Sequence, residues 1–207
     1  MKKRIVTILI FTFIFIAKSS AQGNDYPTVN IPDSGDRDIP SGWLLAGSNP
    51  YDYAVGIDLI ESKSGYASAY LKSTSTKPVG FANLMQEIKA NNFRGQRVRL
   101  SASIKAKFIS GWSGLWMRVE DVIGRPLGFD DMSNRSIVGS SEWFQYEIVL
   151  DVPNNSDKIA FGILLNGKGQ VWVDNVKLLV VSSDVPVTDL LSKKVDQFYP
   201  ENMDFEE

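Results

Sequence analysis

Strict alternation between apolar and polar positions dominates the middle of the chain. From Gln96 to Phe108, apolar residues stand at nearly every second position, with arginine, serine and lysine between them. Successive side chains of a strand point to opposite faces, so this period of two predicts a strand with one buried and one solvated face. The alternation at 115–120 predicts a second such strand, with Leu115, Met117 and Val119 on one face and Trp116, Arg118 and Glu120 on the other.

Further β-rich runs cover residues 143–152, 159–165 and 170–181, and shorter candidates lie at 41–47, 68–72 and 80–88. Turn signals such as Ser110-Gly111 and Val138-Gly139 fall between the runs. Helical patterns are short: one turn at 85–92, and a helix at 188–195 with Thr188 or Asp189 as its N-cap. Many short strands without crossover helices predict an all-β antiparallel β-sandwich rather than a parallel α/β sheet.

The N-terminus has the three-part layout of a secretory signal peptide. Three basic residues at 2–4 precede an apolar run at 5–17, and small residues at Ser19 and Ala21 predict cleavage near Ala21. The run is shorter than the roughly 20 residues of a membrane-spanning helix, although an uncleaved anchor is the alternative. We therefore expect a periplasmic or secreted protein without membrane insertion after cleavage. The expected organisation is a signal peptide (1–21), a polar linker (22–40), a sandwich module (41–181) and an acidic tail (182–207).

Composition excludes several kinds of chemistry. The 207 residues include no cysteine and no histidine, which rules out disulfides, thiolate metal sites and Ser-His-Asp catalysis. Formal net charge is −2 for the whole chain, and residues 1–21 hold four basic residues and no acid, so the expected mature chain is more acidic. No basic block remains, which argues against nucleic acid as a partner. These observations favour a non-catalytic protein, with a lyase or glycosidase as a minor alternative.

Several motifs resemble bacterial galactose-binding-like β-sandwich modules of the carbohydrate-binding kind. The resemblance begins at Gly42-Trp43, is most distinctive at 111–119, and ends with Val-Trp-Val-Asp-Asn-Val at 171–176. Some modules of this type are joined to helix-turn-helix regulators or to hydrolases. The resemblance implies a jelly-roll sandwich that binds carbohydrate or a related small polar ligand. The alternative is a structural or protein-interaction sandwich, acting through its tail or a sheet face.

Trp112, Trp116, Arg118 and Asp130 are the candidate ligand residues. If Leu115 and its partners at 117 and 119 are buried, Trp116 and Arg118 point outward together, where an exposed indole covers the apolar face of a sugar. Arg118 would hold a hydroxyl or the carboxylate of an acidic sugar, and Asp130 would bond hydroxyls. The alternative is that both tryptophans belong to the core or lie under a loop.

Two further expectations follow from the resemblance. The acid in the place of Asp174 often helps to hold a structural calcium ion in such modules, so Asp174 is the candidate metal ligand. Such modules also commonly open with Asn-x-Asp-Phe-Glu, which this chain carries at 202–206 instead. That tail is interpreted as the start of a second module, as a strand that pairs with this sheet or with a protein partner, or as a solvated segment.

Overall fold

The computed structural model describes residues 39–191, which fold into nine strands and two short 3₁₀ helices. The helices are η1 (Pro50–Asp52) and η2 (Ser133–Arg135). The strands are β1 (Leu44–Gly47), β2 (Tyr53–Asp58), β3 (Ser68–Ser73), β4 (Phe81–Lys89), β5 (Gln96–Asp121), β6 (Pro126–Asp130), β7 (Ile137–Val152), β8 (Ser156–Asn166) and β9 (Gln170–Val181). The prediction of an all-β antiparallel fold is confirmed.

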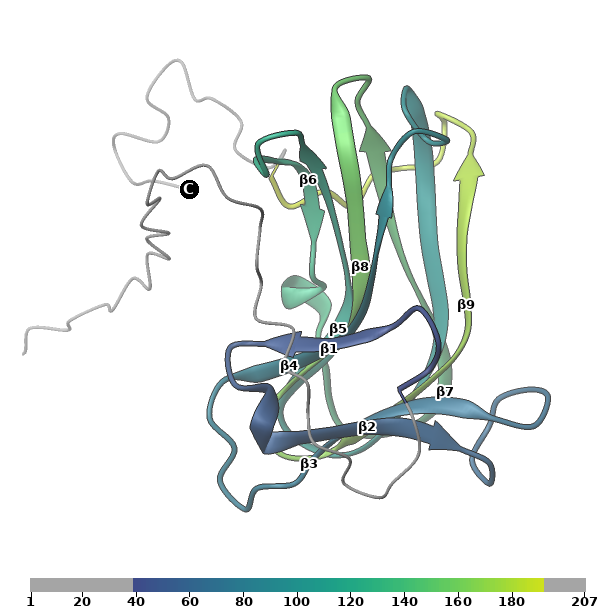
Figure 1. The fold of residues 1–207 in the computed structure, drawn as a ribbon. Coiled ribbons are helices and arrows are strands. Elements are labelled where there is room, and N and C mark those ends of the chain that lie inside the picture. The colour runs from purple at the N-terminus through teal and green to yellow at the C-terminus, as the bar shows by residue number, and fades with distance from the viewer. Residues whose placement is uncertain (1–38, 192–207) are drawn as a thin grey trace, which may run out of the picture.

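Two layers share one strand. The first half of β5 pairs with β7 and β9, and β9 continues through β3 to β2; we call this layer sheet II. The second half of β5 pairs with β6 and β8, and β8 continues through β4 to β1; we call this layer sheet I. In Figure 1, β5, β8 and β9 stand upright while β1, β2 and β3 cross their lower end.

The hydrophobic core fills the space between the two layers. Inward side chains of β5, from Val98 and Leu100 to Leu115, Met117 and Val119, are at most 5% exposed. The predicted alternation is therefore confirmed in both halves of this strand, but it is wrong at Phe108, which was expected on the buried face and is 73% exposed. Burial of such side chains, at roughly 25 cal/mol per Å² of apolar surface, is the main term that holds the layers together.

The predicted turn at Ser110-Gly111 is wrong, because β5 runs through it without interruption. Gly111 serves close approach between strands instead. A Cβ built at this position would lie 2.4 Å from the backbone oxygen of Asn166. Likewise, Val138-Gly139 lies inside β7 and does not separate two strands. The bend of β5 is marked at Phe108, which has a positive φ of 55°, and by register shifts around it.

The segment 182–191, which we call the strap, packs against both sheets. The Thr188 amide donates to the Val149 carbonyl of β7, and the Leu190 amide donates to the Phe129 carbonyl of β6. The predicted helix at 188–195 is wrong as far as residue 191. Asp189 accepts hydrogen bonds from the backbone of Phe129 and Leu191 rather than capping a helix. The signal peptide, most of the linker and the 202–206 motif lie outside the described residues.

Substitution of Gly162 tests the packing of sheet I. A Cβ at Gly162 of β8 would lie 2.2 Å from the Leu84 carbonyl oxygen of β4. We expect Gly162→Ala to destabilise the fold by about 1–3 kcal/mol, because backbone must move. Gly128→Ala is the matched control, since its Cβ would meet only ordinary contacts from 3.6 Å outward. Thermal melts of both variants measure the difference in stability. Equal stability of the two variants would contradict the close approach of β8 and β4 at Gly162.

Candidate functional site

The outward face of sheet I carries the candidate ligand residues of β5. Trp116 lies opposite Gly162 of β8, and Gly162 lies opposite Met85 of β4, so the three positions form one row across the sheet. The next row toward the start of β5 pairs Gly114, Leu164 and Asn83 in the same way. The outward face thus brings together residues from three strands that are distant in the sequence.

Trp116 points outward as predicted, but the expectation that its indole is exposed is wrong. Its side chain is only 6% exposed and forms a small cluster with Ala160 and Leu164. Phe81, Met85 and Trp112 pack against this cluster and are partly buried. Two of the neighbouring β8 positions, Ala160 and Gly162, carry a methyl group and no side chain, respectively, which leaves room for the larger side chains to close around the indole. Trp116 is therefore an internal part of this face rather than an open platform.

Three side-chain polar atoms of this face are buried without a hydrogen-bond partner in the described part of the chain: Trp116 Nε1, Asn83 Oδ1 and Arg118 Nε, the last of which has only an ion pair with Glu120. Neither Trp116 Nε1, a donor, nor Asn83 Oδ1, an acceptor, makes a hydrogen bond with the described part of the chain. Each such group costs about 1–3 kcal/mol, and folded proteins rarely tolerate it without a reason. Trp116 of β5 and Asn83 of β4 lie in adjacent rows of one face with β8 between them, so this face has one unused donor and one unused acceptor that are both neutral.

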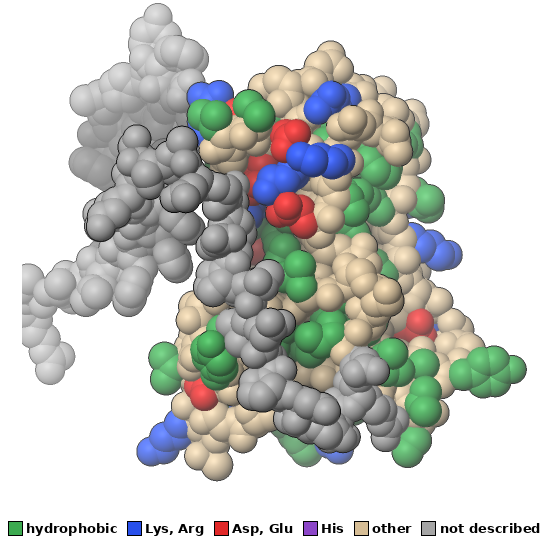
Figure 2. Space-filling view, in the orientation of Figure 1, with side chains coloured by type: hydrophobic (Ala, Val, Ile, Leu, Met, Phe, Trp, Pro, Cys, Tyr) green, Lys and Arg blue, Asp and Glu red, His purple; other side chains and the backbone are tan. Residues whose placement is uncertain are grey.

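A row of charged side chains borders the Trp116 cluster. Arg118 Nε lies 2.5 Å from Glu120 Oε1, and the Arg118 guanidinium carbon lies 5.9 Å from the centre of the Trp116 ring. Lys158 of β8 is 3.1 Å from Glu87 of β4 and 3.8 Å from Glu120. Figure 2 shows side chains of both charges side by side above a group of hydrophobic ones.

Sequence reasoning missed Asn83, Met85, Glu87 and Lys158. The alternation of 83, 85 and 87 within a predicted strand was a usable signal for a shared face. Nothing in the sequence said that this face adjoins Trp116, because β4 reaches β5 only through β8.

Asp130 does not belong to this face. It lies opposite Met117, whose side chain points into the core, and it is fully buried. Both carboxylate oxygens are bound by the Arg135 guanidinium at 3.1 and 2.6 Å, and the Met132 amide donates to one of them at 2.8 Å. Asp130 thus fixes the turn after β6, and the expectation that it bonds a ligand beside Trp116 is wrong.

Asp174 anchors the loop between β2 and β3. Its Oδ2 accepts hydrogen bonds from the Lys63 and Ser64 amides, both at 2.9 Å, and its Oδ1 accepts one from the Asn175 amide at 2.6 Å. Calcium needs oxygen ligands, whereas these neighbours present N–H groups to the carboxylate. Within residues 39–191 no three acidic side chains are grouped for a metal ion. The described residues at Asp174 therefore do not fit the expected calcium ion.

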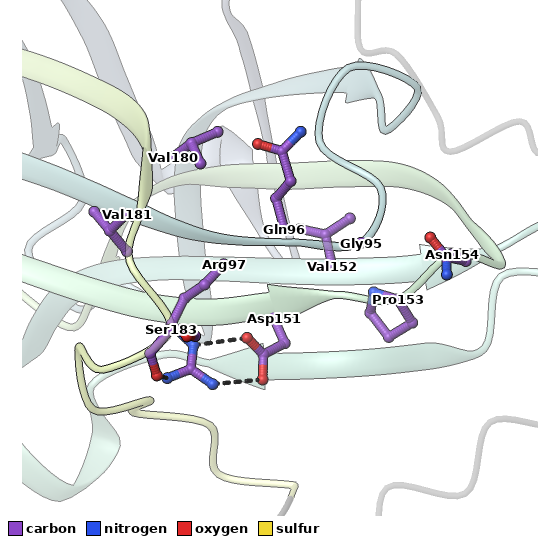
Figure 3. A pocket seen from close by; sticks show the side chains of 10 residues that line it. All are labelled: Gly95, Gln96, Arg97, Asp151, Val152, Pro153, Asn154, Val180, Val181 and Ser183. Atoms are coloured by element: carbon purple, nitrogen blue, oxygen red, sulfur yellow. Dashed lines mark hydrogen bonds and ion pairs between the residues drawn. The ribbon is translucent and has the colours of Figure 1, made fainter.

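Two surface depressions lie elsewhere. The larger, about 620 Å³, includes Arg97, Asp151 and Ser183 (Figure 3). Arg97 donates to both oxygens of Asp151, at 2.7 and 3.0 Å, and to the Ser183 and Val185 carbonyls, so its donors hold the strap. Hydrogen bonding to Asp151 raises the pKa of Arg97. The smaller, about 440 Å³, opens between the sheets beside Trp43.

No helix within residues 39–191 has the length and apolar character needed to cross a bilayer.

Chelation and an Asp174 variant test the role of that residue together. We expect the melting temperature of the unaltered protein to be the same with and without chelator, because N–H groups surround the carboxylate. Asp174→Asn should lower stability by about 1–3 kcal/mol, since the amide nitrogen replaces one acceptor of the loop. Calcium titration of both proteins is the control. A chelator-sensitive melt that Asp174→Asn makes insensitive would restore the calcium site.

Comparison with known proteins gives one relative of high identity. The chain is 46% identical over 167 residues to YbfP of Bacillus subtilis (strain 168), described as an uncharacterized HTH-type transcriptional regulator. The match covers 80% of this chain and 57% of the regulator, so the chain spans little more than half of that protein's length. No protein-family model matches the chain.

Solved structures share the fold at low identity. The CBM22-1 xylan-binding domain of Paenibacillus barcinonensis Xyn10C superposes with a TM-score of 0.51 at 13% identity, covering 72% of this chain and 91% of that domain. The Stig cyclase Fisc from Fischerella sp. TAU superposes with a TM-score of 0.50 at 15% identity, covering 74% and 91%. The same architecture therefore serves a binding domain and an enzyme. The resemblance stated from sequence is confirmed for the fold: the chain has the galactose-binding-like β-sandwich of carbohydrate-binding modules.

Proposed function

We propose that the outward face of sheet I binds a carbohydrate or a related small polar ligand, without catalysis. The observation that carries this proposal is the pair of buried, unpartnered polar atoms, Trp116 Nε1 and Asn83 Oδ1. A donor and an acceptor that both lack partners match the hydroxyl groups of a saccharide, because each hydroxyl can accept one hydrogen bond and donate another. Apolar neighbours such as Met85 and Leu164 suit the C–H surface of a sugar ring.

Ligand entry requires a small rearrangement of this face. Trp116 Nε1 is shielded from solvent, so a ligand reaches it only when covering side chains turn aside. Met85 and Trp112 are the mobile candidates, since both are only partly buried. Methionine has an unbranched, flexible side chain that adapts to different partners. The binding energy then includes the gain from satisfying two groups that were unpaired in the free protein.

Two comparisons support the proposal without deciding it. The solved xylan-binding domain shares the fold, and the bacterial regulator shares nearly half of its residues with this chain over the matched range. If the segment 1–21 is an export signal, the ligand is met outside the cytoplasm. A sandwich of this type within a regulator would bind the same kind of ligand as a sensor.

Replacement of Trp116 by phenylalanine tests the proposal. The substitution keeps an aromatic ring but removes Nε1–H, a donor that makes no hydrogen bond in the free protein. We expect oligosaccharide affinity to fall about three- to tenfold, the value of one hydrogen bond, with little loss of stability beyond that of the smaller ring. Titration calorimetry against a panel that includes xylohexaose and hexagalacturonate measures the affinity.

Trp172→Phe is the matched control. Trp172 is also buried, at 8% exposure, but its Nε1 donates to Asp58 Oδ2 at 2.9 Å. It lies on the outward face of sheet II, between the core residues Val171 and Val173. This variant should lose about 1.5–3 kcal/mol of stability, because a hydrogen bond to a charged group disappears, and keep its affinity. Unchanged affinity in Trp116→Phe, or equal loss in both variants, would remove the site.

A further inference from the structure

We propose that the ligand of the sheet I face is an uncharged saccharide, and that acidic sugars are disfavoured. This inference rests on the proposed function and specifies its ligand class. It stands on the ion pairs that border the Trp116 cluster. A cationic side chain can bind an acidic sugar only if it can turn toward the sugar carboxylate. Whether each charged side chain is already in an ion pair therefore decides which class of sugar fits.

Each outward-facing charge of β4, β8 and the second half of β5 is already paired. Lys89 of β4 lies 3.0 Å from Asp157, and Lys158 lies 3.1 Å from Glu87. Arg118 lies 2.5 Å from Glu120, which also has Lys158 at 3.8 Å. Three cations and three carboxylates thus balance to zero. No excess positive field remains on this row to attract an anionic ligand.

Arg118 is a cation that lies over the Trp116 ring, and it forms an ion pair with Glu120. The Glu120 side chain is 5% exposed, so its charge depends on Arg118 and Lys158 for compensation. A sugar carboxylate that drew Arg118 away would leave a buried carboxylate with a weakened partner, and removal of one member of a buried pair is strongly unfavourable. The carboxylates of Glu120 and Glu87, which lie on the same face, would also repel the sugar carboxylate.

A neutral hydroxyl makes no such demand. The Arg118 side chain is 30% exposed, and its guanidinium carries five N–H donors in a rigid fork. A hydroxyl accepts from the solvent-facing part of that fork while the ion pair with Glu120 stays intact. Trp116 Nε1 and Asn83 Oδ1 add one donor and one acceptor, both neutral. The whole face then recognises hydroxyl groups without a change in its charge pairing.

Salt dependence separates the two classes of ligand. Contacts with a charged ligand weaken as salt screens them, whereas hydroxyl contacts do not. We expect the protein to select uncharged glycans from an array that holds neutral and uronate-containing chains. Their dissociation constants should change less than about twofold between roughly 25 and 500 mM NaCl. Hexagalacturonate should bind at least about tenfold more weakly than the best neutral hexasaccharide, a difference of about 1.4 kcal/mol.

Glu87→Gln supplies a gain-of-function arm. Glu87 is the more exposed partner of Lys158, with 35% of its side chain exposed. Its replacement therefore leaves Lys158 with one fewer carboxylate partner, while the ion pair between Arg118 and Glu120 is kept. The variant should bind hexagalacturonate more tightly than the unaltered protein does, and this gain should vanish at high salt. A thermal melt confirms that the variant is folded.

The possible results distinguish the neutral-ligand inference from the proposed function. Preference for uronate chains, with affinity that falls as salt rises, overturns the neutral-ligand inference and leaves the proposed function standing. Absence of binding to every glycan on the array overturns both. Salt-independent binding of neutral chains, together with the Glu87→Gln gain, supports the inference.

Discussion

The continuity of β5 through both layers is the constraint on which the rest of the structure depends. One strand of 26 residues contributes core side chains to both sheets and pairs with β6, β7, β8 and β9. Within each half, its alternation sets the inward and outward faces of one sheet, and the phase of the alternation changes around Phe108, where the register shifts. Because a shift of one residue would exchange the two faces of its half, burial of Leu115 and Met117 holds Trp116 and Arg118 outward. The candidate site is positioned by the core beneath it.

Local patterns in the sequence were enough to predict the fold. They could not predict the surroundings of the candidate site, because these depend on contacts between residues that are distant in the sequence. The outward direction of Trp116 follows from its own neighbours, Leu115 and Met117, and was predictable. Its burial depends on Ala160 and Gly162, more than 40 positions away, which no local pattern reports. Asp130 and Phe129 necessarily face opposite ways, but which of them faces the core depends on a hairpin register that includes a bulge at Val119 and Glu120.

The role of a glycine in the sequence was also ambiguous, because it too depends on a partner strand that is distant in the sequence. Ser110-Gly111 has the residues of a turn, yet Gly111 is needed because the Asn166 backbone lies against it. A small residue permits a sharp turn or a close neighbour, and only the partner strand distinguishes the two. Asp174 is a similar case: the sequence indicated an acid that matters at this place, while the structure directs its oxygens to backbone amides of the 63–64 loop. In both cases the residue was important for a reason other than the expected one.

The strap has a mechanical consequence. It leaves the end of β9 in sheet II, is held by Arg97, bonds to β7 at Val149, and then bonds to β6 of sheet I at Phe129. A pulling force on the chain at Leu191 would therefore first load β6 and β7, the strands outside the central path of each layer, before it reached β9. The two layers would share the tension, so the strands would not be pulled off the sheet one at a time. Force applied at Leu191 is therefore transmitted to the body of the sandwich as a single unit.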